Sequence, residues 1–461
     1  MAEGTSYQTV VEPPGSQRAR WAWAFFDWAG QPYFTLTNTF VFAPYFASQV
    51  APDPATGQAM WGWALAAAGL GVALLSPLLG AYADRQPDTR PLIGGFGLVM
   101  IVAATALWWA VPDSQTLWPI LVAAAIGNLC AEALLVLTNA MLPAVSRPGG
   151  MGRLGGTAWG IGYAGGLIAL ALMLVFAVAD PDSGETIAGL DPVFGLDPTQ
   201  GEGARASGPF SAIWFVLFAW PLFAMMPTIL ARMPKRRETT APLLGSVWQD
   251  LSALARQRGP MFRFLLGRMI YQDGLNALLA FGGIYAAGIF GWTTTELGIF
   301  GILIILTAVF GSWLGGLADD RFGPKRTVMA SLVGLIITGA LAISVTQDQI
   351  FFVVAVEPSD GRLFGSAAEQ TYLAIALCLG LFTGPVQSPS RTLLVRLSEP
   401  EKLTQFFGFY ALTGKITAFL APAAVALFTT ISNSQRVGMS VILVFLVVGL
   451  WLLRKVPDLR G

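Results

Sequence analysis

Long apolar runs, separated by short polar segments, follow one another along this sequence. A helix that crosses a lipid bilayer needs about 20 mostly apolar residues. Runs of that length are found at 22–47, 59–82, 92–111, 117–141, 156–179 and 210–231, and again at 262–288, 295–318, 327–346, 370–393, 404–430 and 437–453. The pattern predicts an all-α polytopic membrane protein with twelve transmembrane helices in two six-helix halves.

A longer polar stretch separates the sixth apolar run from the seventh and divides the chain. We expect a cytoplasmic tail at 1–20, an N-terminal half at 21–232, a cytoplasmic linker at 233–261, a C-terminal half at 262–455 and a second cytoplasmic tail at 456–461. Within the linker, apolar residues recur at helical spacing between Leu243 and Arg258. That spacing predicts an amphipathic helix lying on the membrane surface.

Basic residues gather on one side of the predicted helices. With a cytoplasmic N-terminus, about 21 of the 27 Lys and Arg residues lie inside, as the positive-inside rule requires. No removable signal peptide precedes the first apolar run, and the excess of Arg over Lys is typical of a GC-rich bacterial genome. We therefore expect an integral protein of a bacterial inner membrane with both termini in the cytoplasm.

Composition restricts the chemistry further. Hydrophobic residues make up 54% of the chain and the net charge is zero, so neither a soluble domain nor a nucleic-acid partner is expected. There is no histidine, which excludes His-based catalysis and His-containing metal sites. Cys130 and Cys378 both lie in apolar runs, where buried thiols are expected and not a disulfide. We expect no enzyme activity, cofactor or metal.

One short motif occurs twice, each time after the second apolar run of a half. The first copy reads Gly80-Ala81-Tyr82-Ala83-Asp84-Arg85, and the second reads Gly315-Gly316-Leu317-Ala318-Asp319-Asp320-Arg321-Phe322-Gly323-Pro324-Lys325-Arg326. The second copy resembles the G-x-L-A-D-R-x-G-R-K loop of the major facilitator superfamily, and the first is a degraded copy. The resemblance implies the major facilitator fold, with twelve helices in two halves.

A finer resemblance extends over nearly the whole chain. The segments Trp23–Ala29, Asn139–Pro143, Gly160–Gly166, Tyr271–Gly274 and Phe406–Tyr410 are similar to the unidentified major facilitator family, which includes the autophagy-related vacuole effluxers of fungi. This resemblance implies solute efflux, with amino acids as the cargo of the vacuolar members. It also implies that spans one, four, seven and ten line a central cavity. Span four departs from the superfamily pattern, because it carries Asn128 and Glu132 in place of a buried arginine.

The repeated motif predicts a gate at the cytoplasmic surface. Asp84 and Asp319 can accept hydrogen bonds from backbone N–H groups at the N-terminus of a neighbouring helix, where the helix dipole favours an anion. The charged residues beside them complete the predicted gate: Arg85, Asp320, Arg321 and Arg326. A latch of this kind closes the cytoplasmic side in one state and opens in the other.

Ionisable residues inside the apolar runs are candidate site residues, because an unpaired charge in hydrocarbon is strongly disfavoured. Glu132 and Lys415 lie near the predicted midplane, by counting residues at 1.5 Å each. Asp27, Asp273 and Arg391 lie nearer the cytoplasmic third, and the polar residues Asn128, Asn276 and Gln387 complete the predicted substrate and coupling site. A helix-dipole role for Asp27 and an interfacial position for Arg391 are alternatives of equal weight.

We expect a monomeric secondary transporter that moves a small polar or zwitterionic, amino-acid-like solute by alternating access. Efflux is the expected direction, protons are the candidate coupling ion, and membrane lipids are the expected neighbours. A lipid or lysolipid flippase is one alternative and would need an apolar cavity wall. A non-transporting membrane receptor or scaffold is another, and it would tolerate neutral substitutions of the buried charges.

Overall fold

The computed structural model describes residues 16–112, 117–180, 183–233, 242–292, 294–357 and 363–458. The N-terminal half comprises α1 (Gln17–Pro32), η1 (Tyr33–Phe40), α2 (Phe42–Tyr45), η2 (Phe46–Val50), α3 (Pro54–Arg85), α4 (Arg90–Ala106), η3 (Leu107–Trp109), α5 (Leu117–Asn139), α6 (Leu142–Val145), α7 (Met151–Phe176), η4 (Val193–Gly195), α8 (Glu202–Arg205) and α9 (Ser207–Leu230). The linker helix α10 (Leu243–Gln257) leads to α11 (Pro260–Phe290), α12 (Thr294–Phe322), α13 (Pro324–Ile343), β1 (Gln349–Ile350), β2 (Val354–Ala355), α14 (Ala367–Leu397), η5 (Pro400–Lys402), α15 (Leu403–Thr413), α16 (Leu420–Ser432) and α17 (Gln435–Arg454).

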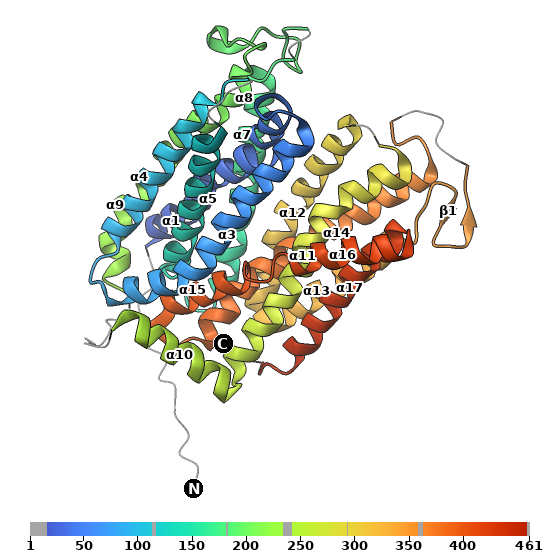
Figure 1. Ribbon diagram of the computed structural model, residues 1–461. Coiled ribbons are helices and arrows are strands. Elements are labelled where there is room, and N and C mark those ends of the chain that lie inside the picture. Colours follow the sequence, from blue (N-terminus) through green and yellow to red (C-terminus); the bar gives the residue numbers. More distant parts are fainter. Residues whose placement is uncertain are drawn as a thin grey trace.

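The helices form a bundle in two halves (Figure 1). The twelve spans that the hydrophobic pattern predicts fit the described helices. Ten helices of the described residues are long and apolar enough to cross a membrane. The first and eleventh spans are interrupted, so each consists of shorter helical pieces. The predicted tail at 1–15, the linker segment 234–241 and the last residues 459–461 lie outside the described residues.

The first span is not the single continuous α-helix that the apolar run 22–47 predicts. Pro32 has no backbone N–H, so the carbonyl four residues before it has no helical partner. That carbonyl, of Trp28, instead accepts a hydrogen bond from Nε1 of Trp214 at 3.1 Å. The chain then widens into the π-helix η1, a geometry often found at functional sites.

The eleventh span breaks between α15 and α16, where a continuous helix was expected at 404–430. Gly414 follows the last residue of α15, and the segment from there to Phe419 forms turns. Pro422 lies in the first turn of α16, where its missing N–H is tolerated, but it prevents the helix from extending back toward α15. Lys415 is therefore on a turn within the span and not on a helix.

Helix α10 lies across one end of the bundle, hereafter the α10 face, and the segment carrying α8 lies at the opposite end (Figure 1). Near the α10 face the halves contact each other through small residues. A Cβ on Gly80 would lie 2.3 Å from the carbonyl oxygen of Thr404, and one on Gly156 would lie 2.3 Å from that of Ser312. Only glycine permits α3 to meet α15, and α7 to meet α12, this closely.

Helix α10 is tied to both halves, which explains its position. Arg85 donates to Oγ of Ser246 at 2.6 Å. The Nζ of Lys402 lies 2.8 Å from Oδ1 of Asp250. Burial acts to lower the pKa of Lys402, but the hydrogen bond and the charge of Asp250 outweigh it and raise that pKa. The linker therefore bridges the two halves across the closed end.

Candidate functional site

A central cavity of about 310 Å³ lies between the two halves. It is lined by Gln31, Phe34, Glu132, Leu135, Val136, Asn139, Trp159, Tyr163, Arg268, Gln272, Asn276, Gln387, Arg391, Phe407, Tyr410, Ala411, Gly414 and Lys415. Charged groups, amides and aromatic rings thus line the same cavity, together with apolar side chains. The described residues contain no group of three or more Cys, Asp and Glu side chains that could hold a metal ion.

Glu132 and Lys415 meet across the cavity. Nζ of Lys415 lies 2.8 Å from Oε1 of Glu132, and the two side chains are 32% and 19% exposed. Glu132 comes from the middle of α5 in one half, and Lys415 from the turn between α15 and α16 in the other. Because both groups remain partly exposed to the cavity, a ligand can reach them and replace one charge with another.

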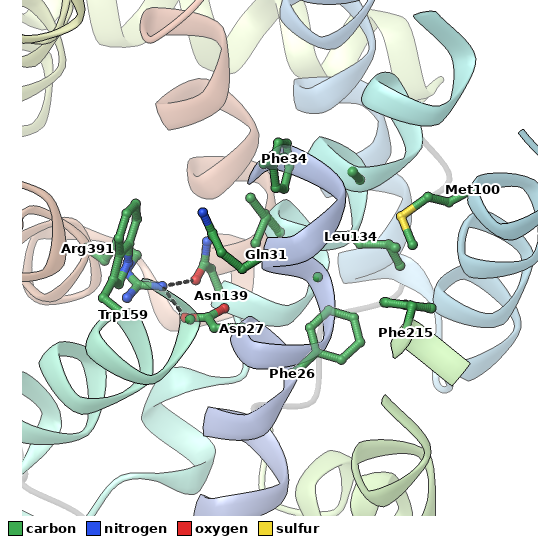
Figure 2. A pocket seen from close by; sticks show the side chains of 14 residues that line it. Phe26, Asp27, Gln31, Phe34, Met100, Leu134, Asn139, Trp159, Phe215 and Arg391 are labelled. Carbon is green, nitrogen blue, oxygen red and sulfur yellow. Dashed lines mark hydrogen bonds and ion pairs between the residues drawn. The ribbon is translucent and has the colours of Figure 1, made fainter. Parts of the chain in front are cut away.

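Arg391 forms a second connection between the halves, in a neighbouring pocket that shares Asn139, Trp159 and Arg391 with the central cavity (Figure 2). Its Nη1 donates to Oδ1 of Asn139 at 2.6 Å and lies 3.8 Å from Oδ2 of Asp27. Nη2 donates to the carbonyl of Gly155 at 3.2 Å, and the ring of Trp159 lies 5.1 Å from the guanidinium carbon. Only 2% of the side chain is exposed, so the interfacial alternative for Arg391 is wrong.

Arg268 and Asp273, both on α11, do not form an ion pair. Nη1 of Arg268 donates to the carbonyl of Tyr410 at 2.7 Å and to Oγ1 of Thr413 at 3.2 Å. Its guanidinium carbon lies 3.3 Å from the centre of the Tyr410 ring. Asp273 is 1% exposed and does not line the cavity.

The predicted polar residues divide into two groups. Asn276 and Gln387 line the cavity, and Asn276 accepts a hydrogen bond from Gln272 at 2.9 Å. Asn128 does not line it, because its side-chain oxygen accepts a hydrogen bond from Asn38 at 2.8 Å on the first span. Asn128 thus joins the first and fourth spans.

Several cavity residues were not among the predicted site residues. Gln31, Asn139, Trp159, Tyr163 and Tyr410 all line the cavity. Three of them lie in segments that resemble the vacuole effluxers, which was the available signal. Aromatic residues in apolar runs are otherwise indistinguishable from packing residues.

The two motif copies contact the N-termini of two different helices near the α10 face. The carboxylate of Asp84 accepts hydrogen bonds from the backbone N–H groups of Thr404 at 3.0 Å and Gln405 at 2.9 Å, at the start of α15. In the second copy it is Asp320, and not Asp319, that accepts from Gly152 at 2.8 Å and Arg153 at 3.1 Å, at the start of α7.

Asp319 has a different environment from the one predicted. It is fully buried against Gly152, where an added Cβ would lie 2.5 Å from the Asp319 Cβ. The remaining gate residues point elsewhere. Arg326 pairs with Asp458 at 2.8 Å, and the Arg321 guanidinium lies 5.3 Å from the centre of the Phe322 ring. Both of these contacts lie within the C-terminal half, so among the described residues they do not join the two halves.

Comparison with known proteins identifies relatives of the whole chain. The family model described as "Vacuole effluxer Atg22 like" matches residues 150–461. An uncharacterized MFS-type transporter, YxiO of Bacillus subtilis, is 24% identical over 446 residues, which cover 95% of this chain and 94% of YxiO. Autophagy-related protein 22 of Cryptococcus neoformans is 24% identical over 317 residues, covering 67% of this chain and 51% of the fungal protein.

The fold also matches a solved structure. The major facilitator transporter FucP, in its outward conformation, superposes with a TM-score of 0.67 at 14% identity. The superposition covers 96% of this chain and 99% of FucP. At this identity the match establishes the fold alone.

Proposed function

The chain belongs to the Atg22-like family of vacuole effluxers and is a membrane transporter of the major facilitator type, and we propose that it exports a small zwitterionic, amino-acid-like solute. The proposed mechanism is alternating access, in which the two halves rock about the central cavity. Glu132, Lys415, Asn276 and Gln387 are the proposed substrate residues.

The pair of Glu132 and Lys415 is the observation that carries this proposal. A carboxylate from one half and an ammonium from the other face the same cavity, 2.8 Å apart. A free amino acid carries the same two groups, so its ammonium can bind Glu132 while its carboxylate binds Lys415. Exchange of one ion pair for two keeps every charge neutralised, which a cavity inside a membrane requires.

The composition of the cavity wall argues against the flippase alternative. A lipid needs an apolar surface for its chains, whereas this wall brings together Glu132, Arg268, Arg391 and Lys415 with several amides. A scaffold would have no need of charges in a cavity of this size. Under either alternative, neutral solutes of similar volume bind as well as zwitterions, or no small solute binds at all.

The proposal also includes the orientation of the protein in the membrane and the direction of transport. Arg85 and Lys402, two of the basic residues that the positive-inside rule places inside, contact α10. The α10 face is therefore proposed to be cytoplasmic, with both termini on that side. The described contacts then represent a state closed to the cytoplasm, in which Asp84 and Asp320 hold the halves together. Efflux follows the family's description, and the proposed setting is a monomer in a bacterial inner membrane, with protons as the coupling ion.

A thermal-shift panel tests the substrate class directly. Purified protein in detergent would be incubated with each of the twenty L-amino acids, their carboxyl-amidated forms and their N-acetylated forms. A ligand at 100 times its dissociation constant stabilises the folded state by about 2.7 kcal/mol. We expect at least one free amino acid to raise the unfolding temperature, and both of its capped forms to have little effect because each lacks one charge.

The panel distinguishes the zwitterion site from its rivals. Stabilisation by a capped form as large as that by the free amino acid would show that only one charge is recognised. Absence of any shift across the amino acids, with a shift from a lysolipid added below its critical micelle concentration, would favour the flippase.

A further inference from the structure

Asp273 differs from the other two acidic residues identified within the apolar runs. Glu132 and Asp27 each have a basic group within 4 Å. In the part of the chain that the structure describes, Asp273 has no such ion pair, and its Oδ1 has no hydrogen-bonding partner. The side chain of Thr417, from the turn within span eleven, lies beside it. A fully buried carboxylate without a cation is strongly disfavoured unless it holds a proton.

Arg268 is the basic residue on the same helix with which a deprotonated Asp273 can pair. It lies five residues earlier on the same helix, a rise of about 7.5 Å. Its donors are instead used at the end of α15, on Tyr410 and Thr413, while its Nε has no partner among the described residues. Arg268 therefore clamps α15 immediately before the turn that Asp273 faces.

The clamp is linked to the closed end of the molecule through α15. The first residues of this helix, Thr404 and Gln405, are held by Asp84 of the N-terminal half. Its last turn is held by Arg268 of the C-terminal half, and beyond Gly414 the span breaks. One end of α15 is therefore held by the N-terminal half and the other by Arg268 of the C-terminal half. Because the helix is short, a movement of Arg268 is transmitted to the contact between the halves.

The surroundings of Asp273 contain few other groups that could titrate with it. Its own helix carries Arg268 and Tyr271. The cavity that the neighbouring Gln272 lines also contains Tyr410 from α15, Lys415 from the turn and Arg391 from α14. Helix α16 has no charged residue, and the charged residues of α17, Arg436 and Arg454, lie at its ends. Lys415 and Arg391 are occupied by Glu132 and Asp27, which leaves Arg268 as the available partner.

We propose that Asp273 binds the coupling proton of this transporter and that its deprotonation draws Arg268 from the end of α15, releasing the contact between the halves at the α10 face. The proton passes between Asp273 and water of the central cavity, which the neighbouring residues Gln272 and Gly414 line. With Asp273 protonated, Arg268 stays on Tyr410 and the closed arrangement persists. This inference rests on the proposed transport function, but it concerns the ion and not the solute.

Spin-label distances measure the proposed switch without any solute. In a variant with Cys130→Ala and Cys378→Ala, labels at Tyr82→Cys on α3 and Glu401→Cys beside α15 report the separation of the halves at the α10 face. Double electron–electron resonance would be recorded in lipid nanodiscs from acidic to alkaline pH. We expect a short distance at acidic pH and a growing longer-distance population as the pH rises.

Three variants test whether Asp273 is the residue that binds the proton. Asp273→Asn, which imitates the protonated acid, should keep the short distance at every pH. Arg268→Gln should remove the pH response as well, because no cation remains to be drawn away. If Asp273→Asn retains the pH response and Glu132→Gln abolishes it, the proton binds Glu132 and the proposal is overturned.

The experiment also separates this proposal from the proposed function. A wild-type distance that does not change with pH, together with a positive result in the amino-acid panel, would reject the proton switch and keep the substrate proposal. A pH response that depends on Asp273, together with no stabilisation by any amino acid in the panel, would support the proton switch and reject the substrate proposal.

Discussion

At the scale of single residues, Arg391 shows how this bundle tolerates a buried cation. Its guanidinium is paired with Asp27 and donates to Asn139 and the carbonyl of Gly155, all from the other half. The side chain also lies beside the Trp159 ring. The ion pair therefore favours association of the halves in this state.

Removal of the Asp27 charge should destabilise the protein. Asp27→Asn leaves Arg391 buried without a counter-charge, and breaking a buried pair in this way costs about 3–5 kcal/mol. We expect a clear drop in the unfolding temperature of the purified protein in detergent. The double variant Asp27→Asn with Arg391→Met should recover part of that loss. Unchanged thermal unfolding of the single variant would show that the pair contributes nothing to stability.

Depth along the sequence places Glu132 and Lys415 at the same level, where the structure pairs them. Glu132 and Lys415 were expected at the same level because counting from each span end gives their depth. The partner of Arg391 could not be derived in this way, because the rotation of one helix against another is not encoded in residue spacing. For the same reason the sequence did not distinguish Asp319 from Asp320: adjacent helical residues point about 100° apart, and only the packing of α12 on α7 decides which one meets the helix N-terminus.

At the scale of elements, the hydrophobic pattern predicted the spans but not their interruptions. The residues at the interruptions of the first and eleventh spans are still mostly apolar, so the hydropathy pattern does not reveal these interruptions. Pro32 and Pro422 are the available cues, but a proline within an apolar run is also compatible with a bend in a continuous helix. In the structure the first span changes from α-helix to π-helix at Tyr33, and the eleventh span breaks into turns after Thr413, both beside the cavity.

The two helix N-termini at the α10 face provide an element-scale test. Asp84→Asn should weaken the α3–α15 contact, and Asp320→Asn the α7–α12 contact, since an anion at a helix N-terminus contributes about 0.3–2 kcal/mol. Cysteines introduced at the buried positions Ser76 and Ser312 report these contacts separately. We expect a rise of roughly two- to thirtyfold in maleimide labelling rate at Ser76→Cys with Asp84→Asn, and at Ser312→Cys with Asp320→Asn.

A nearby acid outside the gate serves as the matched control. Asp88 is paired only with Arg90 on the surface, and the hydrogen bond from Arg90 holds the pKa of Asp88 below its ordinary value, so it is charged at neutral pH. Asp88→Asn should leave both labelling rates unchanged. Equal increases with all three variants would attribute the effect to general surface charge and not to the helix N-termini.

At the scale of the whole molecule, the two halves meet through polar contacts at three levels. Asp84 and Asp320 act at the α10 face, Arg391 lies beside the cavity, and Glu132 with Lys415 lies within it. In alternating access the contacts at the α10 face must break while the solute bridges the halves. The central pair is therefore assigned to binding, and the contacts at the α10 face to closure.

The affinity of the central pair for an amino acid tests this account most directly. Isothermal titration would use the amino acid that most raises the unfolding temperature in the panel, with wild-type protein, Glu132→Gln and Lys415→Met. Loss of one partner of a buried charge pair costs about 2–5 kcal/mol, which is at least a roughly thirtyfold loss of affinity. The account predicts such a loss in both variants while each remains folded and monodisperse. Wild-type affinity in both variants would show that Glu132 and Lys415 are packing residues and that the substrate binds elsewhere.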